Sequence, residues 1–283
     1  MSAVGTSPLA PVAATAPTLV RSNLAVTQRR VVLSEWTKFR SLRSTVWTLL
    51  VAVLLMVGLG ALFSSVTASR FATLSPAEQA GFSPAGTSLT GVLFAQLAVG
   101  VLGVLAMSGE YGTGMIRASF TVVPRRLPVL WGKIAVFAAA VFAVSLVAAV
   151  GSFYLGQALL HSHHLDVAIT APGAARQVLG AALYLTVAGI IGVSLGALLR
   201  TTAAGIATFA GVFFVIPPLM NLLPSSINDH ISPYLPSNAG GAIYSAQVGG
   251  SHSLSPWVGF ALLCGYAVVL TAAAAWRLRR TDA

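Results

Sequence analysis

Acidic side chains are scarce in this chain, and none of them falls inside its long apolar runs. Six Asp and Glu residues stand against sixteen Lys and Arg residues in 283, which gives a formal net charge of +10. Charged residues make up 8% of the chain and hydrophobic residues 56%, with a mean hydropathy of +0.85. Because so few polar side chains cannot cover a soluble globule of this size, the sequence predicts an integral membrane protein.

Other absences exclude several kinds of chemistry. Cys264 is the single cysteine, which rules out disulfides within the chain and cysteine-rich metal sites. The motifs HExxH, GxSxG and GxxxxGK[ST] are missing, so we expect no protease or hydrolase centre, no ATP-binding loop and no cofactor in this chain. The apolar runs also lack the ionisable relay that ion-coupled carriers place near the bilayer midplane. The dispersed basic residues favour anionic lipid over nucleic acid as a partner.

Six uncharged hydrophobic runs predict six transmembrane helices. They cover residues 46–63, 89–107, 134–160, 178–199, 203–223 and 257–276, and each is long enough as a helix to cross a hydrocarbon core of about 30 Å. Of the sixteen basic residues, only Arg70 and Arg176 fall on the side opposite the termini. Because cationic residues concentrate in cytoplasmic loops, both termini are predicted to be cytoplasmic. The predicted fold class is an all-α integral membrane protein.

The regions outside the runs divide the chain further. Residues 1–26 are rich in Ala, Pro, Ser and Thr, which predicts a disordered cytoplasmic tail. In residues 27–45, Val32, Trp36 and Phe39 recur at helical spacing, which predicts an amphipathic helix on the inner membrane surface. That helix either anchors the first span or presents Glu35 and Lys38 to a cytoplasmic partner. Residues 46–276 form the predicted six-span domain, and residues 277–283 a basic cytoplasmic tail.

The segment between spans 2 and 3 has its own helix signals. Gly112, Thr113 and Gly114 favour the end of span 2 and the start of a short helix, which Pro124 ends. A short helix beneath the membrane is a surface that a soluble subunit could push, although a basic anchor alone would also explain Arg125 and Arg126.

Small and polar residues inside the spans indicate how the helices pack and what they enclose. Gly192 and Gly196 have GxxxG spacing, which favours close approach of another helix. Residues 200–202 predict a tight hairpin between spans 4 and 5, and the prolines at 217 and 218 predict a kink. Gln96, Gln157 and Asn221 suit a path for an amphiphilic cargo and equally suit hydrogen bonds between helices.

Histidines cluster once, after span 3. His161, His163 and His164 lie near Asp166 and are the only group with metal-ligand residue types. Adjacent histidines do not share a helical face, so a tetrahedral zinc site would need a bent loop. A solvated loop is the favoured interpretation, and an outer-face metalloenzyme is kept as an alternative.

Three segments together resemble the type-two permease family of ATP-binding-cassette (ABC) transporters, particularly its actinobacterial members. They are SEWTKFRSLRST at 34–45, GEYGTG at 109–114 with PRR at 124–126, and LPSNAG at 235–240. The resemblance covers the chain from about Thr27 onward. It implies a bacterial cell-membrane subunit that pairs with a second permease, as a homodimer or heterodimer, and with separate nucleotide-binding subunits that hold ATP and magnesium.

The resemblance also implies roles for particular residues. The interface helix and the short coupling helix would contact the ATPase subunits, and the loop before span 6 would form an outer gate. Carried onto this chain, the ATPase contacts are Glu35, Lys38, Arg40, Glu110, Thr113, Gly114, Ile116 and Arg117, and the gate contains Pro217, Pro218 and Asn238. The chain has no fused ATPase and no large outer domain, so the cargo of larger relatives does not transfer to it.

We therefore expect a permease subunit that exports a hydrophobic or amphiphilic drug, lipid or peptide, with no enzymatic activity of its own. Two other hypotheses remain. A membrane assembly or immunity protein would need no ATPase, and a metalloenzyme would use the histidine cluster.

Overall fold

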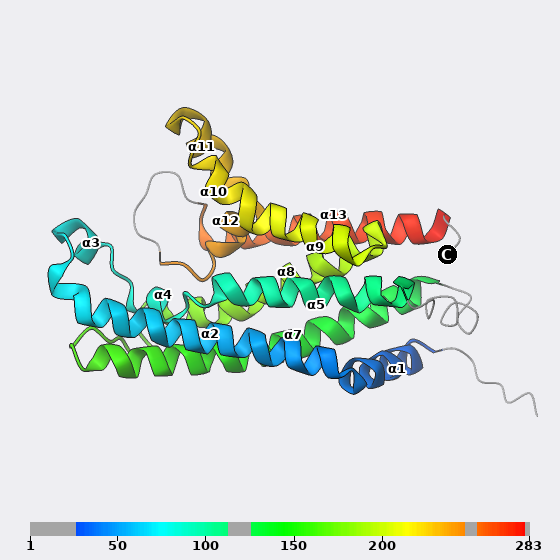
Figure 1. Cartoon of the computed structure of the whole chain (residues 1–283), viewed down its shortest axis with the longest axis horizontal. Helices are drawn as coiled ribbons and strands as arrows, with labels where there is room; N and C mark the ends of the chain where they lie inside the picture. Colours follow the sequence, from blue (N-terminus) through cyan, green and yellow to red (C-terminus); the bar gives the residue numbers. More distant parts are fainter. Residues whose placement is uncertain (1–26, 113–125, 247–253, 281–283) are drawn as a thin grey trace, which may run out of the picture.

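The computed structural model is a bundle of helices joined by short connections (Figure 1). The structure describes residues 27–112, 126–246 and 254–280, and no strand occurs within these ranges. Six helical segments are long and apolar enough to cross a membrane: Arg43–Thr73, Val92–Gly112, Leu127–His161, Ala174–Leu199, Thr202–Met220 and Pro256–Arg280. The predicted all-α class with six candidate spans is therefore confirmed.

The helices at the α1 end of the bundle reach beyond the apolar runs. Helix α1 covers Gln28–Ser41, and α2 follows after Leu42 as Arg43–Arg70. Helix α5 is Val92–Gly112 and α7 is Arg126–His161, so the parts of the predicted loop at 108–112 and 126–133 are helical. An apolar run measures only the length that fits in hydrocarbon, whereas backbone hydrogen bonds continue through the polar turns beyond it.

Helix α8, Ala174–Leu199, lies at the centre of the bundle, and most of its residues are buried. It packs against α5, α7, α9 (Thr202–Ala210) and α13 (Pro256–Arg280). Glycines allow the closest of these contacts, because a Cβ added at Gly196 would lie 2.6 Å from the carbonyl oxygen of Val104, and one at Gly192 would collide with that of Gly100. The close approach predicted from the GxxxG spacing is confirmed, with α5 as the partner.

Span 5 is interrupted by a wider helical turn. After α9, residues Gly211–Val215 form a π-helix, in which the N–H of Ile216 donates to the carbonyl of Gly211, and α10 follows as Ile216–Met220. The two prolines in α10 lack backbone donors and crowd the preceding turn, which the π-helix accommodates. In Figure 1, α10 and α11 (Ser225–Ile231) lead away from the bundle.

Short helices join the spans at the end of the bundle opposite α1. Between α2 and α5 lie the 3-10 turn Phe71–Thr73, α3 (Pro76–Ala80) and α4 (Pro84–Ser88). After α11, the 3-10 turn Ser232–Tyr234 leads to α12, Pro236–Gly241, which packs on α13. The described part of the segment before span 6 is therefore also built of short helices.

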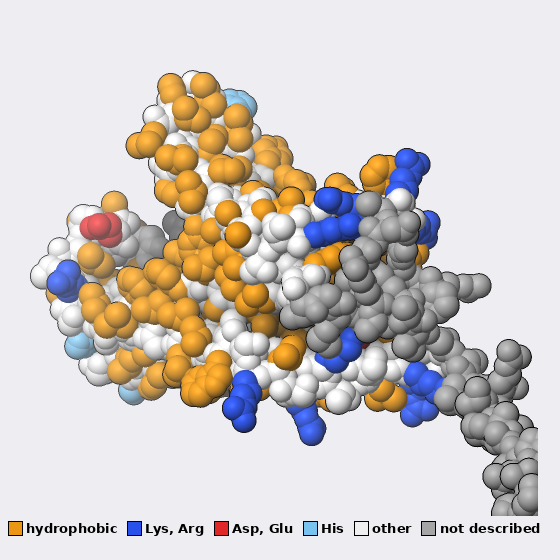
Figure 2. Space-filling view, turned by 45° about the vertical axis from the view of Figure 1, so that its right-hand side comes forward, with side chains coloured by type: hydrophobic (Ala, Val, Ile, Leu, Met, Phe, Trp, Pro, Cys, Tyr) orange, Lys and Arg blue, Asp and Glu red, His pale blue; other side chains and the backbone are white. Residues whose placement is uncertain are grey.

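Both α1 and the last turn of α13 lie at one end of the bundle (Figure 1). The hairpin between α8 and α9 is as tight as predicted, because Arg200 caps α8 in the left-handed region at φ 60° and α9 begins at Thr202. Most of the Lys and Arg side chains visible in Figure 2 lie toward the α1 end, whereas hydrophobic side chains cover the middle of the molecule.

Candidate functional site

Four charged side chains from three helices meet at the α1 end. Lys133 Nζ of α7 lies 2.8 Å from Glu35 Oε2 of α1 and 2.9 Å from Glu110 Oε1 of α5. Lys38 Nζ of α1 lies 2.7 Å from Glu35 Oε1 and 3.4 Å from Glu110 Oε1. We call these four residues the ionic cluster. Two carboxylates and two ammonium groups balance formally, as buried charges generally require.

Burial is uneven across the ionic cluster. The side chain of Glu35 is only 4% exposed and that of Lys133 9%, whereas that of Lys38 is 33% exposed. Burial alone would raise the pKa of the Glu35 carboxyl, but the charge and hydrogen bond of Lys133, together with Lys38, outweigh it and hold the pKa below its ordinary value. For Lys38, burial lowers the pKa, but Glu35 and Glu110 more than compensate and raise it.

The spacing of the buried residues of α1 explains how Glu35 reaches α7. Val31 and Glu35 are one turn apart and are the two buried residues of the helix, whereas Trp36 and Arg40 are exposed. A Cβ added at Gly132 of α7 would lie 3.0 Å from the Val31 side chain, so the glycine allows α1 to approach. Gln28 Nε2 also donates to the Pro128 carbonyl at 3.2 Å. Helix α1 is therefore held along the first turns of α7.

Further contacts connect the remaining helices at this end. The Arg200 guanidinium lies 5.2 Å from the ring centre of Tyr111, and the hydroxyls of Ser108 and Thr202 are 3.0 Å apart. Arg277 of α13 donates to the carbonyl of Leu198. Together with the ionic cluster, these contacts link α1, α5, α7, the α8–α9 hairpin and α13.

The predicted ATPase contacts occupy different environments. Arg40 is exposed and Lys38 partly exposed, so both are accessible to a docked subunit. Glu35 and Glu110 point into the ionic cluster instead. Thr113, Gly114, Ile116 and Arg117, and with them the predicted coupling helix, lie outside the described residues.

The structure does not bring the predicted cargo-path residues together. Gln96 is fully buried between α5 and α8, where its Oε1 accepts from the Tyr184 hydroxyl and its Nε2 has no partner in the described ranges. Gln157 Nε2 donates to Ser88 Oγ at 2.9 Å and to the Pro84 carbonyl at 3.1 Å. Its Oε1 accepts from the N–H of Val167 at 2.8 Å. Asn221 is exposed at the end of α10.

The predicted gate residues lie on two separate helices. Pro217 and Pro218 belong to α10, and Asn238 belongs to α12, where its amide donates to the carbonyl and hydroxyl of Ser232, both at 2.9 Å. Asn238 therefore fixes the turn between α11 and α12. The gate assignment itself stays a prediction.

The histidines after α7 lie on an exposed segment, where one of them contacts Asp166, and form no closed site among the described residues. His161 Nδ1 lies 3.1 Å from Asp166 Oδ1, with 74% of the histidine side chain exposed. His163 and His164 are also exposed. Among the residues that the structure describes, no three metal-binding side chains lie close enough to hold an ion.

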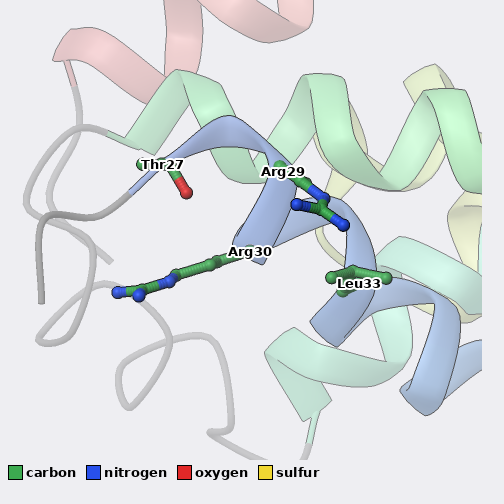
Figure 3. Close-up of a pocket in the computed structure, with 4 residues that line it drawn as sticks. All are labelled: Thr27, Arg29, Arg30 and Leu33. Atoms are coloured by element: carbon green, nitrogen blue, oxygen red, sulfur yellow. The ribbon is translucent and has the colours of Figure 1, made fainter.

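A basic pocket of about 620 Å³ lies at the start of α1, lined by Thr27, Arg29, Arg30 and Leu33 (Figure 3). The two arginines point away from each other in this view. The lining offers guanidinium groups but no carboxylate, imidazole or thiol, so its chemistry suits an anionic group rather than a metal ion.

Two positioning residues were missed by the sequence analysis. Lys133 looked like one more basic residue beside a span, and only its position directly before the apolar run at 134–160 indicated that it could be buried. Arg176 of α8 donates through Nη1 to the Ile243 carbonyl at 2.7 Å and through Nη2 to that of Ser245 at 3.2 Å, which fixes the segment after α12. The sequence did offer one signal for Arg176, because it is one of only two basic residues predicted on the side opposite the termini.

The arrangement defines a class of protein: a helical chain with six candidate membrane spans, which indicates a multi-pass membrane protein. A scan against models of known protein families gives no match, and a search of curated protein sequences gives none either.

Proposed function

We propose that this chain is the membrane-spanning permease subunit of an ABC transporter that exports a hydrophobic or amphiphilic compound from a bacterial cell. Separate nucleotide-binding subunits bind ATP and magnesium and dock at the α1 end, which faces the cytoplasm. A second permease, identical or related, completes the translocation path. The sequence supports this proposal through its resemblance to type-two permeases, its basic residues on one side and its lack of an ATP-binding motif.

The ionic cluster is the observation that carries the proposal furthest. It joins α1 to α5 and α7, the two helices that flank residues 113–125. Separating a buried ion pair is costly, so a push on α1 or on the flanking segment moves the ends of α5 and α7 together. A docked subunit can then bias the bundle between two arrangements by binding one of them more tightly.

The first experiment purifies the full chain from its native membrane and identifies the proteins that accompany it. We expect an ATPase subunit in stoichiometric amount. Purification of the intact chain without any ATPase subunit contradicts the proposal and favours the assembly or immunity hypothesis.

The second experiment tests the coupling role of Lys133 in the reconstituted complex. Lys133→Met should leave the ATPase subunit bound but lower the cargo moved per ATP hydrolysed by about tenfold, the effect of roughly 1.4 kcal/mol of lost coupling. Lys133→Arg retains the charge and should recover much of the ratio. Arg43→Gln, which removes an exposed charge at the start of α2, is the matched control. An unchanged ratio in Lys133→Met would remove the ionic cluster from the mechanism.

A further inference from the structure

An apolar groove runs along the surface of the bundle between α7 and α13. Both helices pack on α8 but touch each other little, so α8 forms the floor through Val187 and Ile190. Trp131 and Ile134 of α7 line one wall of the groove, and Val268 and Ala275 of α13 line the other. The groove has a volume of about 560 Å³. It lies on candidate membrane spans, where its natural surroundings are lipid chains.

The α1 end of the groove is amphipathic. Trp131 of α7 and Trp276 of α13 both line it and are 49% and 58% exposed, and Arg279 lies one turn beyond Trp276. Tryptophan favours headgroup depth in membrane proteins, and arginine favours the phosphates just above it. The lining of the groove therefore changes from apolar to cationic at the depth where a bilayer changes from acyl chains to headgroup phosphates.

The length of the groove matches one leaflet. Cys264 and Arg279 both line it and both belong to α13, and at 1.5 Å per residue they are about 22 Å apart along the helix axis. Half of a hydrocarbon core is about 15 Å, so a groove that begins at headgroup depth reaches the bilayer midplane before it ends.

The charges at the mouth favour an anionic occupant. Arg277 binds the Leu198 carbonyl and Arg280 stacks over Trp276 at 4.5 Å, whereas Arg279 makes no hydrogen bond or ion pair with any residue in the described ranges. A symmetric contact with a second copy along this groove would bring two such basic turns together, which like-charge repulsion disfavours.

We propose that this groove binds an anionic phospholipid from the leaflet at the α1 end, with its phosphate at Arg279 and one acyl chain between α7 and α13. None of the residues predicted to contact the ATPase, to line a cargo path or to form the gate lines this groove. Bound lipid fills the space that α7 and α13 leave open over α8, so it stabilises their separation.

The test uses the full chain with Trp276 as its only tryptophan, the other four being changed to phenylalanine, in phosphatidylcholine vesicles. Phosphatidylglycerol with brominated acyl chains should quench Trp276 fluorescence about fivefold more strongly per mole than brominated phosphatidylcholine, the preference expected of one arginine near headgroups. Arg279→Gln should abolish the preference. Arg43→Gln, an equal charge change outside the groove, should retain it.

Two further measurements distinguish a bound lipid from a second copy of the chain in the groove. Ala275→Leu narrows the groove without changing its charge and should lower the quenching by brominated phosphatidylglycerol, because the chain is excluded. Equal quenching of Trp276 by both brominated lipids in the parent chain overturns the proposal. The proposal is also overturned if brominated phosphatidylglycerol quenches Trp276 as strongly in Ala275→Leu as in the parent. Oxidative crosslinking of two chains through Cys264, the single cysteine and a groove residue, would place a second copy there instead. None of these readouts requires an ATPase.

Discussion

Lys133 is the only member of the ionic cluster that lies on α7, and it joins that helix to Glu35 of α1 and Glu110 of α5. Lys133→Met leaves two carboxylates facing a single ammonium group. Removing one partner of a buried ion pair typically costs about 3–5 kcal/mol, so we expect a clear fall in the thermal unfolding midpoint in detergent. Glu35→Gln combined with Lys133→Met should cost less than the sum of the two single changes, which a double-mutant cycle measures. Additive effects would mean that the two side chains do not interact.

The lowered pKa of Glu35 predicts the direction of a pH effect. Because the folded pKa lies below the ordinary value of 4.5, the stabilisation by the carboxylate is complete above pH 4.5 and is lost as the pH falls through the folded pKa. We expect the unfolding midpoint of the parent chain to fall more steeply below pH 4.5 than that of Glu35→Gln. Parallel curves for the two proteins would show that Glu35 does not titrate with a lowered pKa.

Gln157 differs from Asn221 in what its side chain holds, although both were predicted to line a cargo path. Gln157→Leu removes three hydrogen bonds and leaves the Val167 N–H without its partner, which should cost about 2 kcal/mol or more. Asn221→Leu, at an exposed position, should change stability by about 0.5 kcal/mol or less. Chemical unfolding of both variants in detergent checks this contrast. Equal losses would contradict the role of Gln157 as a clamp between α7 and the loops beside it.

At the scale of helices, the contact between α5 and α8 depends on the absence of side chains. Gly192→Val would push a side chain into the Gly100 carbonyl and should cost about 1–3 kcal/mol, seen as a lower unfolding midpoint. Gly58→Val on α2 is the matched control, because a Cβ there meets no atom within 4 Å. A midpoint as low in Gly58→Val as in Gly192→Val would trace the effect to helix propensity instead of packing.

Helix existence followed from the sequence more readily than helix ends did. Uncharged runs of sufficient length indicated all six spans, and the spacing of Val32, Trp36 and Phe39 indicated α1, because hydrocarbon thickness and helical periodicity constrain local sequence directly. The extension of α7 back to Arg126 was not predictable in this way, since the ion pairs and the α1 contact that accompany it involve residues far apart in the chain. The same reason explains why Glu35 was assigned to a solvent-facing surface although it is buried.

Small residues in a sequence indicate that another helix can approach closely, but they do not identify which helix it is. Gly192 and Gly196 predicted a close contact, and only the three-dimensional arrangement identifies α5 as the helix that makes it. The proline pair at 217 and 218 likewise predicted a distortion of span 5. The form of this distortion is a π-helical turn directly before α10, and it depends on how the carbonyls left without donors by the prolines are accommodated.

On the scale of the whole molecule, charge and apolar surface are separated along the bundle axis. Basic side chains lie mainly at the α1 end and hydrophobic ones cover the middle (Figure 2). Within the described spans, the charged residues stand near helix ends rather than at mid-helix: Arg43, Arg70, Glu110, Lys133, Arg176, Arg277, Arg279 and Arg280. The described part of the spans therefore lacks the mid-helix charged side chain that ion-coupled carriers commonly place near the bilayer midplane.

This separation predicts what the chain can do alone. In sealed vesicles, the purified chain should not move any solute against its gradient when a proton or sodium gradient is imposed, because the middle of each described span carries no charged side chain. Addition of the ATPase subunit with ATP and magnesium should start uphill export, measured as accumulation of a fluorescent amphiphile. Lys133→Arg should retain this export and Lys133→Met should lose most of it. Uphill movement driven by an ion gradient in the absence of the ATPase would instead make this chain a secondary carrier, and its coupling site would then have to use neutral groups such as Gln96, whose amide nitrogen is buried without a partner in the described ranges.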